Sequence, residues 1–213
     1  MGLIDLLKRI PLDLGQGSVA DHTEGKQIAM RLVPPGGTGR TALDVGCRLG
    51  VQTRWLQAQG YEVTSIDVEK LFPDAQVVDA NQRLPFADDS FDLVWCSEVI
   101  EHLQDPAKSL AELRRVTRPG GELVLTTPNS YALLFRFIAL FGLTPQRIQR
   151  KDHLHFFDAD DIGRLCPDAD VYGYFPYMLV KRTIRGAIGA LSPTFVMHIR
   201  KPEAASPSRA ASA

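Results

Sequence analysis

Acidic residues close three consecutive apolar runs of this sequence, and carboxylates in that arrangement can hold a polar ligand. The residues are Asp44, Asp67 and Asp79, and Asp67 follows Asp44 by 23 positions. That spacing suits a carboxylate that accepts hydrogen bonds from two ribose hydroxyls. Asp79 could accept a bond from an adenine amino group, and Asp44 could hold loop amides or, through water, an ammonium group. The set predicts a binding site for a nucleoside.

A short turn bracketed by Gly46 and Gly50 follows the first of these acids. Gly46 has no Cβ, so its backbone can approach a ligand closely. A dinucleotide loop would read G-x-G-x-x-G, but Arg48 stands at the second glycine position, and no GxxxxGK[ST] phosphate loop is present. Arginine tolerates a positive φ poorly. Three alternatives stay open: a different loop shape, a side chain turned outward on an unchanged backbone, or a guanidinium paired with a carboxylate of the ligand or of Asp44.

Three histidines are candidates for catalysis. His102 follows "EVIE" after the fourth apolar run, while His153 and His155 lie in "DHLHFF". Histidine titrates in the range that a general base for an alcohol acceptor requires. Alternation places His153 and His155 on one side of an extended segment, where they form a base and its orienting group or anchor a lid. His102 is either a base or a residue that packs a loop. Asp152 and Asp158 lie nearby without a diagnostic spacing, so no metal site is predicted.

Strand and helix patterns alternate along the chain, which predicts a parallel sheet with helices on both faces. Ligands bind beyond the carboxyl ends of the strands of such sheets, where the acids above are expected. Helices are expected over 20–33, 52–60 and 106–117. The expected strands cover 41–47, 61–68, 75–80, 90–99, 122–128, 170–178 and 194–201.

Composition indicates a soluble globular protein. The chain has 213 residues, of which 45% are hydrophobic and 23% charged, and its net charge of -1 gives no argument for a nucleic-acid partner. Its three cysteines include no CxxC pair, which favours a reducing compartment and a cytoplasmic location. The N-terminal "MGLIDLLKRIPLDLG" is amphipathic and too short to span a bilayer. It is either a packing helix or a weak membrane-surface helix.

The stretches "ALDVGCRLG", "VTSIDVE" and "VVDANQRLPFADDSFDLVWCSEVIEHLQDPAKSLAELRRVTRPGGELVLTTPN" together resemble class I S-adenosylmethionine-dependent methyltransferases. The resemblance covers residues 40–130 and is nearest to the small ubiquinone-type enzymes. It implies a Rossmann-like α/β fold whose seven-stranded, mostly parallel sheet ends in an antiparallel strand. It also implies S-adenosyl-L-methionine as the cofactor. The family loop usually reads G-C-G-x-G, so Arg48 is a departure.

The resemblance also assigns cofactor contacts to ten residues. Four surround the methionine part of the cofactor, two meet ribose and adenine, two meet adenine alone, and two line the floor through their backbone. In that order they are Asp44, Gly46, Cys47 and Gly50; Asp67 and Val68; Asp79 and Ala80; Cys96 and Ser97.

Four regions are expected along the chain. Residues 1–33 form N-terminal helices that cover the cofactor site, and 34–201 form the methyltransferase domain. An insertion over 129–167 covers the acceptor, and the small-residue tail 202–213 is disordered.

The insertion, "TPNSYALLFRFIALFGLTPQRIQRKDHLHFF", resembles a segment of methyltransferases from polysaccharide and lipopolysaccharide assembly. That resemblance implies O-methylation of a sugar hydroxyl on a glycan or glycolipid. A quinone-like or other small aromatic acceptor is the alternative, and a cofactor-binding, catalytically silent partner protein is a third. The apolar "LLFRFIALFGL" fits contact with an inner membrane surface, a homodimer interface or a helix packed on the sheet.

Overall fold

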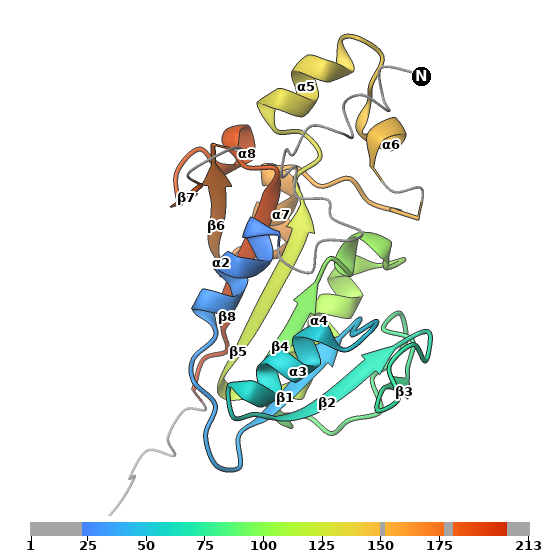
Figure 1. The fold of residues 1–213 in the computed structure, drawn as a ribbon, viewed down its shortest axis with the longest axis vertical. Coiled ribbons are helices and arrows are strands. Elements are labelled where there is room, and N and C mark those ends of the chain that lie inside the picture. Colours follow the sequence, from blue (N-terminus) through green and yellow to red (C-terminus); the bar gives the residue numbers. More distant parts are fainter. Residues whose placement is uncertain (1–22, 150–151, 177–180, 204–213) are drawn as a thin grey trace, which may run out of the picture.

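The computed structural model describes residues 23–149, 152–176 and 181–203 (Figure 1). The predicted amphipathic segment at the N-terminus and most of the predicted disordered tail lie outside these residues. So does the last part of the strand expected over 170–178.

The described residues form one sheet in the strand order β3-β2-β1-β4-β5-β8-β6-β7. Neighbouring strands from β3 to β5 run parallel, whereas β8 is antiparallel to both β5 and β6. The predicted fold class, a mostly parallel α/β sheet with an antiparallel last strand, is confirmed. The strands are β1 Thr41–Val45, β2 Glu62–Asp67, β3 Gln76–Val77, β4 Phe91–Ser97, β5 Thr117–Pro128, β6 Asp170–Phe175, β7 Arg182–Ile184 and β8 Thr194–Arg200.

The strand count differs from the prediction, because the sheet has eight strands instead of seven. The additional strand is β7, which pairs antiparallel with β6 at the edge of the sheet. A strand of three residues is too short to show the alternation by which strands are recognised in a sequence. Its register, for example Gly173 opposite Ile184, depends on pairing with β6.

The strand order reverses next to β1, because β2 pairs on one side of it and β4 on the other. In open parallel sheets, ligands bind beyond the carboxyl ends of the strands at such a reversal. The predicted cofactor residues stand at this edge of the sheet.

Both faces of the sheet are covered. Along β4, Leu93 and Trp95 pack with α2 and α3, whereas Val94 and Cys96 pack with α4 and α7, as strand alternation requires. Asp105 caps the N-terminus of α4, because its side chain accepts a hydrogen bond from the Lys108 N–H at 3.0 Å. The helices are α2 Glu24–Leu32, α3 Val51–Ala58, η1 Ile100–His102 (a 3₁₀-helix), α4 Pro106–Val116, α5 Leu133–Ala139, α6 Pro145–Ile148, α7 Ala159–Leu165 and α8 Ile188–Leu191.

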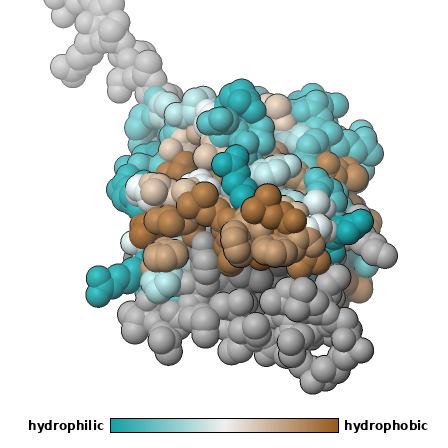
Figure 2. Space-filling view, turned by 90° about the horizontal axis from the view of Figure 1, so that it is seen from above, coloured by the Kyte–Doolittle hydropathy of each residue, from teal (hydrophilic) through white to brown (hydrophobic). Residues whose placement is uncertain are grey.

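The insertion after β5 carries α5, α6 and α7. Its base is held by Asn129, whose side-chain amide donates hydrogen bonds to the carbonyls of Ser192 at 2.7 Å and Gly189 at 3.0 Å. Within α5 only one side is buried, where Phe135 is 1% exposed. Figure 2 looks onto this end of the molecule and shows apolar side chains gathered in a band. The exposed apolar residues of α5 and the turn after it are Leu133, Phe137, Leu140 and Phe141.

None of the helices among the described residues combines the length and the apolar character that crossing a bilayer requires.

Candidate active site

The loop after β1 is a tight turn that only glycine fits at both ends. Gly46 and Gly50 each have a φ of +73°. A Cβ on Gly46 would lie 2.4 Å from Cγ2 of Val99, and one on Gly50 would lie 2.7 Å from the ring of Phe72. Cβ atoms essentially never come so close to another heavy atom. Val99 and Phe72 carry no local signal for these contacts, because they come from segments distant from the turn in the sequence.

The Arg48 side chain is turned outward, as in the second of the three alternatives, and it does not pair with Asp44. Its φ is +45° and its side chain is exposed. Its backbone N–H donates to Oδ2 of Asp67 at 2.8 Å. Its guanidinium forms no ion pair with Asp44 or with any other of the described residues. The arginine therefore leaves the turn closed and keeps its charge in solvent.

Asp67 stands at the end of β2 with one carboxylate oxygen facing each of two backbone donors. Oδ2 accepts the Arg48 N–H, and Oδ1 accepts the N–H of Glu69 at 3.1 Å. An ionised carboxylate has about four lone-pair sites. Two of them remain for ligand hydroxyls, which is the role that the spacing predicts.

Asp44 is almost completely buried, with 1% of its surface exposed. It accepts a 2.6 Å hydrogen bond from the hydroxyl of Thr53, and this hydroxyl also lies 2.8 Å from that of Ser65. Burial is the main cause that raises the pKa of Asp44 to about 6, against an opposing contribution from the Thr53 bond. The loop amide expected to bind Asp44 is held by Asp67 instead.

The other predicted cofactor residues lie along the same edge. Val68 and Asp79 are exposed, and Oδ1 of Asp79 accepts bonds from the backbone and side-chain N–H groups of Asn81 at 2.9 and 2.8 Å. Ala80 is half-buried. At the end of β4, the Ser97 hydroxyl lies 2.8 Å from that of Thr126.

Two of these residues are thiols that pack rather than react. Cys47 and Cys96 are buried, and burial raises the pKa of Cys47 to about 12 and that of Cys96 well above its usual value. The thiolate is the nucleophilic form of cysteine. Both thiols therefore stay protonated and contribute to packing.

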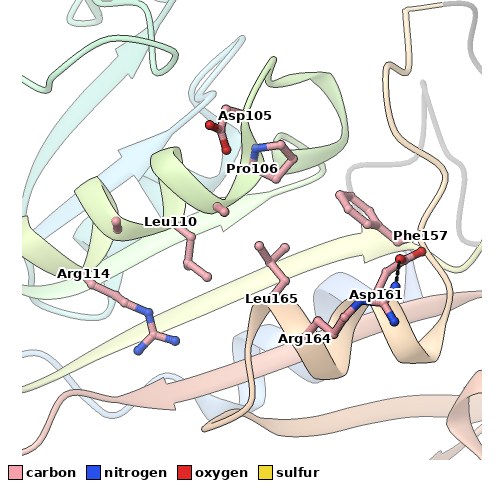
Figure 3. Close-up of a pocket in the computed structure, with 10 residues that line it drawn as sticks. Asp105, Pro106, Leu110, Arg114, Phe157, Asp161, Arg164 and Leu165 are labelled. Carbon is pink, nitrogen blue, oxygen red and sulfur yellow. Dashed lines mark hydrogen bonds and ion pairs between the residues drawn. The ribbon is translucent and has the colours of Figure 1, made fainter.

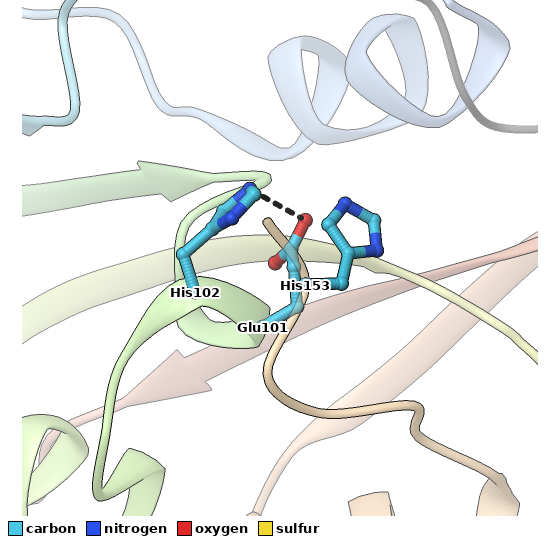
Figure 4. Close-up of side chains that lie close together, drawn as sticks. All are labelled: Glu101, His102 and His153. Atoms are coloured by element: carbon cyan, nitrogen blue, oxygen red, sulfur yellow. Dashed lines mark ion pairs between the residues drawn. The ribbon is translucent and has the colours of Figure 1, made fainter. Parts of the chain in front are cut away.

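His102 and His153 come together although 51 positions separate them in the sequence. Their ring centroids are 4.8 Å apart, and Figure 4 shows the two rings on either side of the Glu101 carboxylate. Glu101 is 1% exposed and its Oε2 accepts a 3.0 Å bond from the hydroxyl of Thr127. This buried carboxylate was missed, although its signal is an acid inside the apolar turn "EVIEHL".

His155 does not join that pair. Its ring stacks on Phe157 with centroids 5.7 Å apart, and its Nε2 is buried with no hydrogen-bond partner among the described residues. The side chains of His153 and His155 therefore lie in different surroundings, although strand-like alternation predicts that they lie on the same side of the segment.

Two pockets are lined by other residues than the predicted site residues. One of about 420 Å³ separates α4 from α7, and its labelled lining includes Leu110, Arg114, Phe157 and Leu165 (Figure 3). Another of about 250 Å³ lies beside α5. None of the predicted site residues lines either pocket.

The residues of the candidate site fall into two groups. We call the residues after β1 and β2, namely Asp44, Gly46, Gly50 and Asp67, the cofactor side. We call Glu101, His102 and His153 the acceptor side. They adjoin through Val99, which packs on Gly46 and whose carbonyl accepts the N–H of His102 at 2.9 Å.

The cofactor side fits an adenosyl amino acid. The side-chain-free backbone at Gly46 admits a close ligand, Asp67 offers oxygens to ribose hydroxyls, and the ionised form of Asp44 attracts an ammonium group.

Comparisons with known proteins agree with this geometry. Residues 43–125 match the family model described as a methyltransferase domain. A ubiquinone biosynthesis O-methyltransferase of Aromatoleum aromaticum is 29% identical over 150 residues, which cover 62% of this chain and 63% of that protein. A 2-methyl-6-phytyl-1,4-hydroquinone methyltransferase of a Synechocystis species is 39% identical over 121 residues, covering 51% of this chain and 37% of that protein.

This chain thus spans less than two thirds of the length of these relatives. A solved structure of an S-adenosylmethionine-dependent methyltransferase from Thermotoga maritima has the same fold, with a TM-score of 0.63 and 17% identity. That similarity covers 93% of this chain and 96% of the other. Together with the glycine turn, the strand-end acids and the strand order, these findings support the predicted resemblance to class I S-adenosylmethionine-dependent methyltransferases.

Proposed function

We propose that this protein transfers a methyl group from S-adenosylmethionine to a hydroxyl group of an amphiphilic acceptor. The observation that supports the proposal is the contact chain through Val99, which packs on Gly46 and accepts the N–H of His102, whose ring lies 4.8 Å from that of His153. When bound, the cofactor supplies an electrophilic methyl group whose bond to sulfur breaks as the acceptor oxygen bonds to carbon, the electron pair staying on sulfur.

The residues of the chain have two tasks in this reaction. On the cofactor side, Gly46, Cys47 and Gly50 shape the turn, Asp44 faces the amino-acid part, and Asp67 holds the ribose, with the methionine floor at Cys96 and Ser97. Val68, Asp79 and Ala80 meet the adenine. On the acceptor side, His102 and His153 orient the hydroxyl group and help to remove its proton, and His155 supports the segment from within.

A sugar hydroxyl on a glycan or glycolipid is the acceptor that we propose first. The resemblance of the insertion to methyltransferases of polysaccharide assembly supports it, since the insertion supplies His153. The exposed apolar side of α5 also fits an acceptor with a lipid part or a membrane surface nearby. A quinol or phenol hydroxyl is the second candidate. It is favoured by relatives whose names contain ubiquinone and hydroquinone.

The decisive experiment follows transfer of labelled methyl groups to two panels of acceptors, glycolipids and short-chain quinols. Wild type is compared with His102→Ala and His153→Ala, and binding of S-adenosylhomocysteine to each is measured by calorimetry. We expect transfer to one panel, losses of roughly 100-fold or more in both variants, and unchanged product binding. Undiminished transfer in both variants would refute the roles of the two histidines.

A cofactor-binding but silent protein would give a different result. It would bind S-adenosylhomocysteine and modify neither panel. Lack of binding at millimolar concentrations would refute the proposal as a whole.

A further inference from the structure

The acceptor side is built from three residues whose types bind metal ions. Glu101, His102 and His153 each offer one ligand atom, and these atoms lie within 4.8 Å of one another. His102 Nε2 is 4.0 Å from Oε1 of Glu101. Metal–ligand bonds of about 2.0–2.2 Å would bring the ligand atoms to roughly 3 Å from one another. Side-chain rotation can supply a movement of that size, because His102 is part-exposed.

Both rings are oriented for ligation through Nε2. His102 Nδ1 lies 3.0 Å from the carbonyl oxygen of Asp152, which can only accept, so Nδ1 carries the proton. His153 Nδ1 lies 3.3 Å from Oε1 of Gln149. Histidines that bind metals typically donate their second ring N–H to such an oxygen, which leaves the lone pair on the other nitrogen.

Hydrogen bonds also hold the Glu101 carboxylate and the segment that carries His153. The Thr127 hydroxyl donates to Oε2 of Glu101, which directs the other oxygen toward His102. The N–H groups of Leu154 and His155 both donate to the Glu101 carbonyl, at 2.9 and 3.1 Å. This clamp fixes His153 beside the carboxylate. A cluster with supporting hydrogen bonds on each member is the pattern of a preorganised ligand set.

We propose that Glu101, His102 and His153 bind one divalent transition-metal ion, with coordination positions left open toward the acceptor. Two imidazoles and one carboxylate suit Zn²⁺, Co²⁺, Mn²⁺ or Fe²⁺. A bound ion would lower the pKa of a hydroxyl group beside it, so His102 and His153 would assist loss of the acceptor proton as ligands of the ion and not as bases, and the proton would pass to solvent. This role of the ion rests on the proposed function, whereas its binding does not.

The test is a titration of the tag-free, chelator-treated protein with Co²⁺ alone, followed by calorimetry and by the visible absorption of the ion. We expect one ion per chain. Glu101→Gln and His153→Gln should each weaken binding roughly 100-fold or more. The matched control is His155→Gln, which changes a histidine of the same segment outside the cluster and should leave metal affinity unaltered. Circular dichroism confirms that each variant is folded.

Two outcomes would overturn the inference: no binding of Co²⁺ or Zn²⁺ at millimolar concentrations, or equal binding by wild type and the folded cluster variants. Calorimetry with S-adenosylhomocysteine separates this result from the proposed function. Product binding without metal binding would reject only the metal site. Metal binding without product binding would reject only the proposed function.

Discussion

Asp67 belongs to the cofactor side and His153 to the acceptor side, and the chain positions these two residues in different ways. Asp67 ends β2 and its carboxylate accepts bonds from Arg48, at the turn after the neighbouring strand, and from Glu69, two residues on. The cofactor side is thus assembled from adjacent parallel strands and the turns that follow them. Its geometry follows almost directly from the sheet.

His153 depends on contacts between distant parts of the chain. The clamp on the Glu101 carbonyl joins η1 to the insertion, and Gln149 joins His153 to Ser130 through hydrogen bonds of 3.3 and 3.1 Å. The acceptor side can therefore be disturbed without changing the sheet. We therefore expect cofactor binding and the positioning of the acceptor to respond separately to mutation.

The largest expected effect concerns the buried charge of the cofactor side. Burial raises the pKa of Asp44 from 3.8 to about 6. Between these values the folded chain binds more protons than the unfolded chain, so the free energy of unfolding falls as pH rises. Asp44→Asn cannot titrate. We expect the difference in free energy of unfolding between the Asp44→Asn variant and wild type to shift in favour of the variant by up to about 3 kcal/mol between pH 4 and pH 7. Urea unfolding at a series of pH values measures this, and a pH-independent difference would contradict it.

The second effect tests the glycine turn itself. Gly46→Ala meets Val99 and also forces a residue with a Cβ to a φ of +73°. We expect a loss of about 2 kcal/mol in S-adenosylhomocysteine binding, which is roughly a 30-fold rise in Kd by calorimetry.

The matched control for this change is Gly142→Ala in the insertion. Gly142 has a φ of +80°, and its Cβ would meet nothing closer than 3.7 Å. The control carries the same backbone strain away from the cofactor side, so its Kd should equal that of wild type. If the Gly46→Ala variant binds S-adenosylhomocysteine with the Kd of wild type, the turn does not contact the cofactor.

The third effect belongs to the acceptor side. Gln149→Ala removes a 5% exposed side chain that joins Ser130 to His153. Leaving buried polar groups unsatisfied costs about 1–3 kcal/mol. We expect faster amide hydrogen exchange in the segment around His153, together with an unchanged Kd for S-adenosylhomocysteine. A parallel loss of cofactor affinity would mean that the two sides are coupled.

The smallest effect concerns the outer surface of the insertion. Leu140 is 80% exposed, so Leu140→Ser should change the free energy of unfolding by no more than about 0.5 kcal/mol. Urea unfolding at low protein concentration measures it. A loss well above that value would reveal that this surface is covered in solution.

Much of the cofactor side was predictable from sequence because its signals are local. An apolar run that ends in an acid and a glycine marks the carboxyl end of a strand, and parallel strands bring such ends to one edge. Gly46, Gly50 and Asp67 accordingly stand where the pattern predicts. Asp44 was placed correctly at the end of β1, but its partners Thr53 and Ser65 lie in α3 and β2 and leave no local trace.

The sequence by itself determined the order of β1 to β6 and β8, the helices α2, α3 and α4, and the acids and glycines at the cofactor side, since short-range periodicity and backbone conformation specify these. Only the tertiary structure decided the direction of Arg48, the pairing of β7, the partnership of Glu101 with His102 and His153, and the separate course of His155. Each of these depends on contacts between residues far apart in the chain. Such contacts form only once the sheet and the insertion have packed, and no periodicity in the sequence records them.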